Sequence, residues 1–501
     1  MSTAAGRAAR ARGPWLAEGV VPGAVAWLVG GLAFGAAMAE LGVLPTIASL
    51  VRADSAVVGF AVHMAVAAIV GAGFGVLVTG QRAGAGETVL WGLAYGALWW
   101  FLGPFTLLPL LLGEPLAWTV PTAQAQFPSL LGHLAYGATT GLALVVIRWR
   151  AQSAGGALRV TAGGLARGLL AGVMAAWLLE VAVAPEREPL ATSVAMGRQP
   201  EVVALLATGL LGAAVGAGYA LLYPRPVDGA GAGLVRGTVY GFVWWVIAAL
   251  TLLPALDGAG LAWSAARARD AFATLPGYLL LGAAVTLANQ WLGALGRLLF
   301  GDHVGRDNEE SAGTRGLRAI GQGALAGFAG GLAFTVVMVQ VGVLGTIARL
   351  VGARSPTTGV AVHLVISVLI GASYGLLFRR QSDTVGSALG WGVGYGFFWW
   401  VLGGITLLPV WLGGEPAWTA AAAASTFPSL VGHLAYGAAL GVVFHLLEAR
   451  STPWWVSRTE LQAARVARRR EQLRSSAPAV WVLVVVIALT IPIVLGQGGA
   501  R

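Results

Sequence analysis

The chain of 501 residues contains no cysteine, and its 31 basic residues are all arginine because lysine is also absent. Without cysteine it has no disulfides, no thiolate nucleophile and no cysteine-ligated metal cluster. Charge is scarce too: 10% of the residues are charged, against roughly 25% in an ordinary soluble domain. Hydrophobic residues make up 57%, and the mean hydropathy is +0.77. This composition predicts a protein that crosses a membrane.

Recognised catalytic patterns are missing as well. The sequence has no Gly-x-Ser-x-Gly elbow, no Walker loop and no His-Glu-x-x-His motif. We therefore expect no enzymatic activity and no bound metal. The net charge of +10 is not a nucleic-acid signal here, because the arginines lie between apolar segments, where such charge sets membrane topology.

One pattern occurs three times in the apolar sequence: Tyr-Gly, then a Trp pair, then Thr-Leu-Leu-Pro. The Trp pairs are Trp99/Trp100, Trp244/Trp245 and Trp399/Trp400. Subtracting these positions gives offsets of 145 and 300 residues. A fixed internal period is typical of repeated structural units. We name residues 1–150 repeat 1, residues 151–300 repeat 2 and residues 301–450 repeat 3, with 451–501 as a separate C-terminal part.

Each repeat has four candidate membrane spans, because a spanning helix needs about 20 apolar residues. With one more at the C-terminus, thirteen are expected: 20–42, 57–79, 89–112, 128–147, 166–184, 202–223, 235–256, 275–295, 320–343, 358–378, 389–412, 428–447 and 479–495. An even number of spans gives all three repeats the same orientation. The sequence therefore predicts an all-α, polytopic protein of parallel four-helix repeats, which we expect to form a quasi-threefold ring.

The distribution of arginines predicts the orientation. If the N-terminus is cytoplasmic, 23 of the 31 arginines fall on the cytoplasmic side. Cytoplasmic loops of membrane proteins carry the excess of basic residues. We therefore expect a bacterial plasma (inner) membrane protein with its N-terminus in the cytoplasm and, after thirteen spans, its C-terminus outside.

The segment before the last span has a different composition. A capping box at Ser457–Glu460 precedes a basic stretch from Arg465 to Arg474. This pattern predicts an amphipathic helix on anionic lipids of the inner leaflet. Docking of a protein partner is the alternative, although nothing in the sequence identifies that partner.

Four histidines lie inside predicted spans at matching positions, namely His63, His133, His363 and His433. The members of each matching pair are 300 residues apart. At about 1.5 Å per residue, all four lie roughly 8–10 Å below the predicted outer boundary. Repeat 2 has Thr208 and Tyr278 at these positions, so we describe it as a degenerate repeat that lacks intramembrane histidine.

Three interpretations of these histidines stay open. Each can be a buried side chain that donates to a neighbouring helix carbonyl, part of a site that handles protons or ions, or an axial ligand of haem b. The first hypothesis for the protein is therefore binding or passage of a small solute or proton-linked ion. The alternatives are a haem b-binding or accessory subunit of a membrane complex, and a scaffold without chemistry.

The acidic residues near the predicted outer face are Glu40, Glu114, Glu180 and Glu415. Glu114 and Glu415 lie in Gly-Glu-Pro turns that lead to Trp118 and Trp418. They are candidates to neighbour the histidines. Solvation of an ordinary turn is the other interpretation of both.

The four-span unit resembles the uncharacterised bacterial inner-membrane proteins of the YagU type. The resemblance rests on a Gly-rich, Tyr-containing stretch after an early histidine (His363 to Tyr374 and Phe378) and on Gly-His-Leu-x-aromatic at 132–136 and 432–436. It implies a small four-span membrane unit, loosely linked to acid tolerance and without an agreed biochemical activity. The threefold fusion and the additional C-terminal span depart from that simple unit.

Overall fold

The computed structural model describes residues 19–78, 84–116, 118–151, 161–183, 201–224, 229–300, 312–379, 381–382, 384–450 and 477–496. Within these ranges the chain forms helices joined by turns and short loops, with no strand. The prediction of an all-α protein is confirmed. The expected basic helix from Arg465 to Arg474 lies outside the described residues.

Twelve helical segments of the described chain are long and apolar enough to cross a membrane. They are Val21–Glu40, Ala56–Val78, Ala85–Leu112, Phe127–Arg148, Ala162–Glu180, Leu205–Leu222, Ala230–Leu256, Ala265–Leu295, Gly316–Val341, Pro356–Phe378, Val385–Trp411 and Phe427–Arg450. These correspond to the first twelve expected spans. The thirteenth forms α24 (Ala477–Val485), the π-helix η8 (Val486–Thr490) and α25 (Ile491–Leu495), and its apolar stretch Ala477–Thr490 is shorter than the others.

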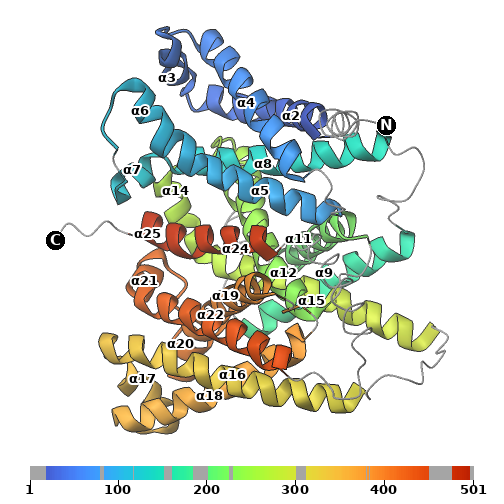
Figure 1. Cartoon of the computed structure of the whole chain (residues 1–501), viewed down its shortest axis with the longest axis vertical. Coiled ribbons are helices and arrows are strands. Elements are labelled where there is room, and N and C mark those ends of the chain that lie inside the picture. The colour runs from blue at the N-terminus through green and yellow to red at the C-terminus, as the bar shows by residue number, and fades with distance from the viewer. Residues whose placement is uncertain are drawn as a thin grey trace, which may run out of the picture. The chain divides into compact units, whose positions relative to one another are not determined.

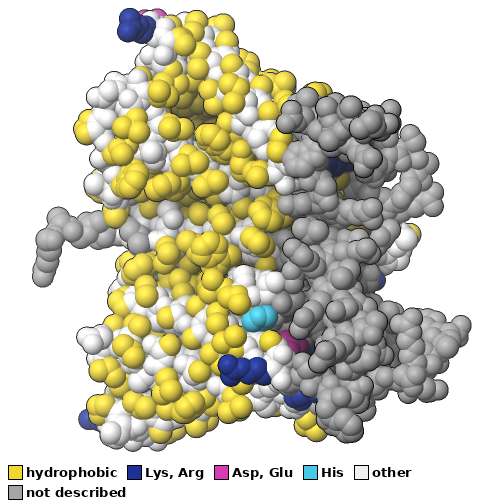
Figure 2. Space-filling model, viewed as in Figure 1, with side chains coloured by type: hydrophobic (Ala, Val, Ile, Leu, Met, Phe, Trp, Pro, Cys, Tyr) yellow, Lys and Arg dark blue, Asp and Glu magenta, His cyan; other side chains and the backbone are white. Residues whose placement is uncertain are grey.

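Large apolar side chains are exposed along these helices. Val57, Ile69 and Leu210 are each more than 70% exposed, and hydrophobic side chains cover most of the described surface seen in Figure 2. A surface this apolar requires a lipid environment. The protein is therefore a multi-pass integral membrane protein in contact with the lipid bilayer.

The chain divides into two compact units. Unit 1 comprises Met1–Arg159 with Leu473–Leu483, and unit 2 comprises Val160–Gln472 with Val484–Arg501. Repeats 2 and 3 thus belong mostly to one unit. The threefold repeat layout and the ring order stay predictions.

Unit 1 contains four long helices with short elements between them. Their order is α2 (Val21–Glu40), α3 (Leu44–Ala48), η2 (Ser49–Val51), α4 (Ala56–Val78), α5 (Ala85–Leu102), the π-helix η3 (Gly103–Leu107), α6 (Leu108–Leu112), α7 (Val120–Ala125) and α8 (Phe127–Ala151). Helix α2 packs against α4 and α8, and α5 packs against α8. The first span therefore contacts the second and fourth, which brings residues of α2, α4 and α8 together.

Unit 2 follows the same order of long helices twice. Its first part has α9 (Ala162–Val183), α11 (Glu201–Leu222), α12 (Ala230–Trp245), the π-helix η4 (Val246–Leu252), α13 (Leu253–Leu256), α14 (Ala265–Asp270), η5 (Ala271–Thr274) and α15 (Leu275–Phe300). Its second part has α16 (Ala312–Val341), α17 (Leu344–Ala348), η6 (Arg349–Val351), α18 (Pro356–Phe378), α19 (Val385–Trp399), the π-helix η7 (Trp400–Leu407), α20 (Leu408–Trp411), α21 (Ala420–Ser425) and α22 (Phe427–Arg450).

The same packing scheme holds in both parts of unit 2. Helix α9 packs against α11 and α15, and α12 against α15. Helix α16 packs against α18 and α22, and α19 against α22, and these four helices lie together in Figure 1. Helix α12 also contacts α18 and α19. Repeats 2 and 3 therefore share an interface inside this unit.

The Thr-Leu-Leu-Pro motif explains why the third span of each repeat contains a π-helix. A proline has no N–H to donate to the carbonyl four residues earlier. The carbonyls freed in this way are paired instead by the following loop: Trp118 Nε1 donates to Phe105 O at 3.2 Å, Ala262 N to Leu250 O at 2.9 Å, and Ala417 N to Ile405 O at 2.7 Å.

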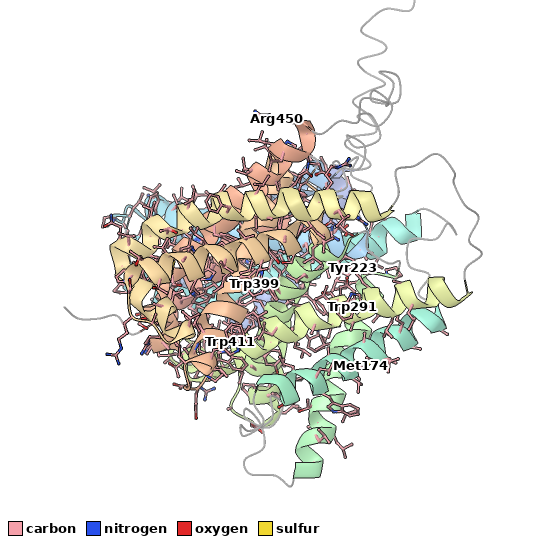
Figure 3. The ribbon with its side chains drawn as sticks, turned by 90° about the horizontal axis from the view of Figure 1, so that it is seen from below. Met174, Tyr223, Trp291, Trp399, Trp411 and Arg450 are labelled. Atoms are coloured by element: carbon pink, nitrogen blue, oxygen red, sulfur yellow. The ribbon has the colours of Figure 1, made fainter. Side chains whose placement is uncertain are left out.

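The threonine of the motif pairs a second carbonyl. In each repeat the Oγ1 atom of this threonine donates to the carbonyl oxygen five residues earlier, at 2.7–2.9 Å. The three threonines are Thr106, Thr251 and Thr406. In Figure 3, Trp399 labels the end of α19, directly before this π-helix, and Trp411 labels the end of α20, which follows it.

Candidate functional site: two histidine clusters

In unit 1 the two predicted histidines pack against one phenylalanine ring. His63 is on α4, His133 is on α8, and Phe34 of α2 contacts both. The Phe34 ring centroid is 5.5 Å from that of His63 and 4.9 Å from that of His133. The centroids of the two imidazole rings can therefore be no farther apart than the sum of these two distances. The two imidazoles thus lie in one region of the bundle.

Repeat 3 has the same arrangement. The Phe334 ring of α16 lies 5.0 Å from His363 of α18 and 4.6 Å from His433 of α22, between ring centroids. His363 is 6% exposed. We name His63, His133 and Phe34 the first histidine cluster, and His363, His433 and Phe334 the second.

One histidine of each cluster connects two helices. His63 Nε2 lies 3.0 Å from Gly31 O of α2, and His363 Nε2 lies 3.1 Å from Gly331 O of α16. A carbonyl oxygen can only accept a hydrogen bond, so Nε2 carries the proton in the neutral ring. The Nδ1 atom of each ring then keeps a lone pair.

The other histidine has the opposite tautomer. His133 Nδ1 lies 2.8 Å from Ser129 O, and His433 Nδ1 lies 2.8 Å from Ser429 O, each one turn earlier on the same helix. By the same argument Nδ1 carries the proton here, and Nε2 keeps the lone pair. Each cluster thus holds two imidazoles fixed at one nitrogen, with a lone pair on the other.

A π-helix lies next to the Nε2 atoms that keep lone pairs. A Cβ added to Gly103 of η3 would lie 3.9 Å from His133 Nε2, and one added to Gly404 of η7 would lie 3.9 Å from His433 Nε2. Neither glycine therefore places a side chain of its own beside the nitrogen. π-Helical turns are frequent at functional sites.

Glu114 and Glu415 lie outside these clusters. Each is exposed, in the loop that follows α6 or α20 respectively. The described residues contain no group of three or more acidic or histidine side chains suited to hold a metal ion.

Repeat 2 has a carboxyl group beside the residue that replaces the first imidazole. Thr208, which replaces His63, is 1% exposed, and its Oγ1 lies 3.5 Å from Glu180 Oε1 of α9. Glu180 is at the position of Gly35 in repeat 1 and Thr335 in repeat 3. Tyr278, which replaces His133, is buried, and its hydroxyl has no partner among the described residues. The Glu180 carboxyl group lies where the first and second spans of repeat 2 cross, the region in which His63 lies in repeat 1.

Sequence reasoning did not identify the phenylalanines or the two glycine carbonyls. A signal was present, because Gly-Gly-Leu-Ala-Phe occurs at 30–34 and again at 330–334, whereas repeat 2 has Ala-Ala-Trp-Leu-Leu at 175–179. The phenylalanine and the histidines thus occur together and are absent together.

The geometry of the clusters also bears on the haem hypothesis. Two axial imidazoles must face each other across a porphyrin, whereas here a phenylalanine ring packs against both. The hypothesis itself stays a prediction.

The site is therefore a pair of alike clusters, one in each unit. In each of them, a phenylalanine and two helix carbonyls fix two neutral imidazoles beside a π-helix. Comparison with protein-family models, with curated proteins and with solved structures finds no match for this chain.

Proposed function

We propose that the protein binds and passes protons, or a small solute that moves with protons, at the two histidine clusters. One observation carries this proposal: every cluster histidine has one ring nitrogen held by a carbonyl and a lone pair on the other. An imidazole held in this way takes up and releases a proton without a change of position.

Two chemical arguments support protons as the species. Histidine is the side chain whose ordinary charge change falls between pH 5 and 8. Ionisable groups are costly inside a membrane and mark ion or proton pathways. The Glu180–Thr208 pair of repeat 2 adds a carboxyl group at the matching crossing.

We place the protein in a bacterial plasma membrane with its N-terminus in the cytoplasm, so that the clusters lie toward the outer side. The arginine distribution supports this orientation.

We also propose that the stretch from Arg465 to Arg474 binds anionic lipids. The resemblance to YagU-type proteins and their loose link to acid tolerance agrees with proton-binding groups near the outer side.

A scaffold role is the second candidate, because a specific contact favours it. The hydrogen bonds from His63 to Gly31 O and from His363 to Gly331 O are ties between helices. A protein whose histidines only joined helices would need no proton flux, and flux therefore separates the two functions.

The test uses purified protein in liposomes that contain a pH-sensitive dye, with proton entry driven by a potassium diffusion potential. The variant is His133→Tyr with His433→Tyr, because repeat 2 carries Tyr278 at this position and its helices pack in the same way. We expect proton flux to fall by about tenfold, since a proton-carrying group is lost.

Trp411→Phe is the control, because Trp411 is 65% exposed on the apolar surface; it should conduct like the wild type. A double tyrosine variant with unchanged flux contradicts the proposal. If His63→Ala with His363→Ala, which removes the hydrogen bonds to Gly31 O and Gly331 O, unfolds more easily than the wild type without a change in flux, the scaffold role is supported instead.

A further inference from the structure

Between the histidine cluster and the opposite end of the bundle, repeat 3 has polar side chains at four positions where repeat 1 has apolar residues, and Glu448 where repeat 1 has Arg148. The differences follow the second and fourth spans. Repeat 1 has Ala67, Gly73, Phe74, Val145 and Arg148, and at the same positions repeat 3 has Ser367, Ser373, Tyr374, His445 and Glu448.

The first polar contact lies one turn beyond the histidines. Tyr436 of α22 donates its hydroxyl to Ser367 O of α18 at 2.7 Å. Tyr436 is three residues after His433, and Ser367 is four residues after His363, so each lies on the same helix face as its histidine. Both residues are buried.

The second contact joins α18 to α19. Ser373 Oγ lies 2.7 Å from the hydroxyl of Tyr395, and the ring centroids of Tyr395 and Tyr374 are 5.4 Å apart. In repeat 1 the matching Tyr95 donates to Val70 O at 3.1 Å and faces Gly73, which has no hydroxyl.

The third contact reaches the end of the bundle. The Tyr374 hydroxyl lies 3.4 Å from Ser382 Oγ, and His445 Nδ1 is hydrogen-bonded to Ser382 O. Glu448 follows His445 by one helical turn, close to Arg450, the last residue of α22, which Figure 3 labels. At this position in repeat 1, Arg148 donates to Val78 O at 3.2 Å, which places a fixed positive charge there.

These groups extend along most of the bundle. His433 and His445 are twelve residues apart on one helix, which at 1.5 Å per residue is about 18 Å of a hydrocarbon core about 30 Å thick. The hydroxyls of Tyr436, Tyr395 and Tyr374 lie between them. In repeat 1 the corresponding Tyr136 hydroxyl has no partner among the described residues.

We propose that repeat 3 alone carries a proton relay, from His363 and His433 through Tyr436, Tyr395, Ser373, Tyr374 and Ser382 to His445 and Glu448. The inference rests on the proposed function, since the second histidine cluster supplies the proton. Two steps are direct, because the hydroxyls of Ser373 and Tyr395, and those of Tyr374 and Ser382, are in contact, and in each pair one oxygen accepts a proton while its own proton leaves. At rest the hydroxyls of Tyr436 and Ser373 donate to the carbonyls of Ser367 and Ile370, and His445 Nδ1 to that of Ser382, so the two hydroxyls turn away from these carbonyls as a proton passes, and His445 takes up and releases it at Nε2. The proposed relay includes water molecules as bridges between successive groups that are not in direct contact.

The test compares two equivalent tyrosines in the full-length protein. Tyr395→Phe breaks the relay, whereas Tyr95→Phe removes the same kind of hydroxyl from the matching place in repeat 1. With the liposome assay for protons, we expect Tyr395→Phe to lower flux by about tenfold and Tyr95→Phe to leave it unchanged. Equal losses in both variants would show a structural role of this tyrosine and overturn the relay.

A second variant introduces only residues that this fold already contains at the matching positions. Ser373→Gly with Tyr374→Phe gives repeat 3 the residues that repeat 1 naturally carries at Gly73 and Phe74. Flux should fall in this variant while its thermal unfolding stays close to that of the wild type. If His133→Tyr with His433→Tyr lowers flux but this variant does not, the relay is wrong and the proposed function stands. If the wild type passes no protons, both fail.

Discussion

Gly237 of α12 and Gly282 of α15 lie backbone to backbone, so that a Cβ added to either glycine would overlap the carbonyl oxygen of the other. The same mutual contact joins the third and fourth spans of the other two repeats, at Gly92 with Gly137 and at Gly392 with Gly437. Close approach at small residues is how helices associate in lipid, where no hydrophobic force drives them together. These glycines therefore hold each four-helix unit together.

Gly282→Val tests this contact. We expect the free energy of unfolding to fall by about 1–3 kcal/mol, because the new side chain forces the helix backbones apart. Thermal unfolding of the purified protein in detergent measures the change. Gly321→Val is the control, since a Cβ at Gly321 meets nothing within 4 Å; equal destabilisation by both changes would contradict the prediction.

Thr406 of repeat 3 should contribute more to stability than Thr106 of repeat 1. Thr406 Oγ1 donates to Val401 O and also accepts from Trp418 Nε1 at 2.9 Å, whereas Trp118 donates to a backbone carbonyl instead. Thr406→Val removes both hydrogen bonds and should cost about 1–2 kcal/mol more than Thr106→Val. Unfolding of the two variants in a denaturing detergent gives the comparison, and a larger effect at Thr106 would refute it.

Tyr136 and Tyr436 occupy matching positions with different surroundings. The Tyr436 hydroxyl donates to Ser367 O at 2.7 Å, and the Tyr136 hydroxyl is buried without a partner among the described residues. Tyr436→Phe should therefore lower the free energy of unfolding by about 1 kcal/mol, whereas Tyr136→Phe should leave it unchanged or raise it. Equal losses at both positions would mean that Tyr136 has a hydrogen-bond partner in the membrane.

Arg269 should stabilise the end of the C-terminal helical segment. Its Nε donates to Leu495 O at 2.6 Å and its Nη2 to Gly496 O at 3.3 Å. A cation at a helix C-terminus pairs the last carbonyls and opposes the helix dipole, worth about 0.3–1 kcal/mol. In Arg269→Leu, amide hydrogen exchange at residues 491–496 should become faster.

Arg267→Leu is the matched control for that experiment. Arg267 donates to Ala259 O within its own loop, so its loss should not change exchange at the C-terminal segment. Unchanged exchange in Arg269→Leu would show that other contacts hold α25.

Much of the architecture could be read directly from the sequence. Apolar length and scarce charge predict spanning helices because the bilayer requires every backbone polar group to be paired within its own segment. The helix pattern of all twelve described spans follows from that local requirement. The recurrence of Tyr-Gly, Trp-Trp and Thr-Leu-Leu-Pro also marks three segments with equivalent hydrogen bonds from Tyr95, Tyr240 and Tyr395.

The candidate site was only partly predictable. The four histidines stood out as ionisable groups inside apolar segments, and their common depth followed from helix geometry. Their partners did not. Phe34, Gly31 and His63 meet because α2 and α4 cross at one particular height and rotation, which packing of side chains decides.

Composition and periodicity alone therefore determined that this protein is helical, spans a membrane many times and carries histidines within its spans. Only the tertiary structure decided that one phenylalanine contacts both histidines of each pair, that Glu180 lies against Thr208, and that Ser373 contacts Tyr395. Spanning is a property of one segment and its solvent, whereas a site depends on the register between segments far apart in the chain.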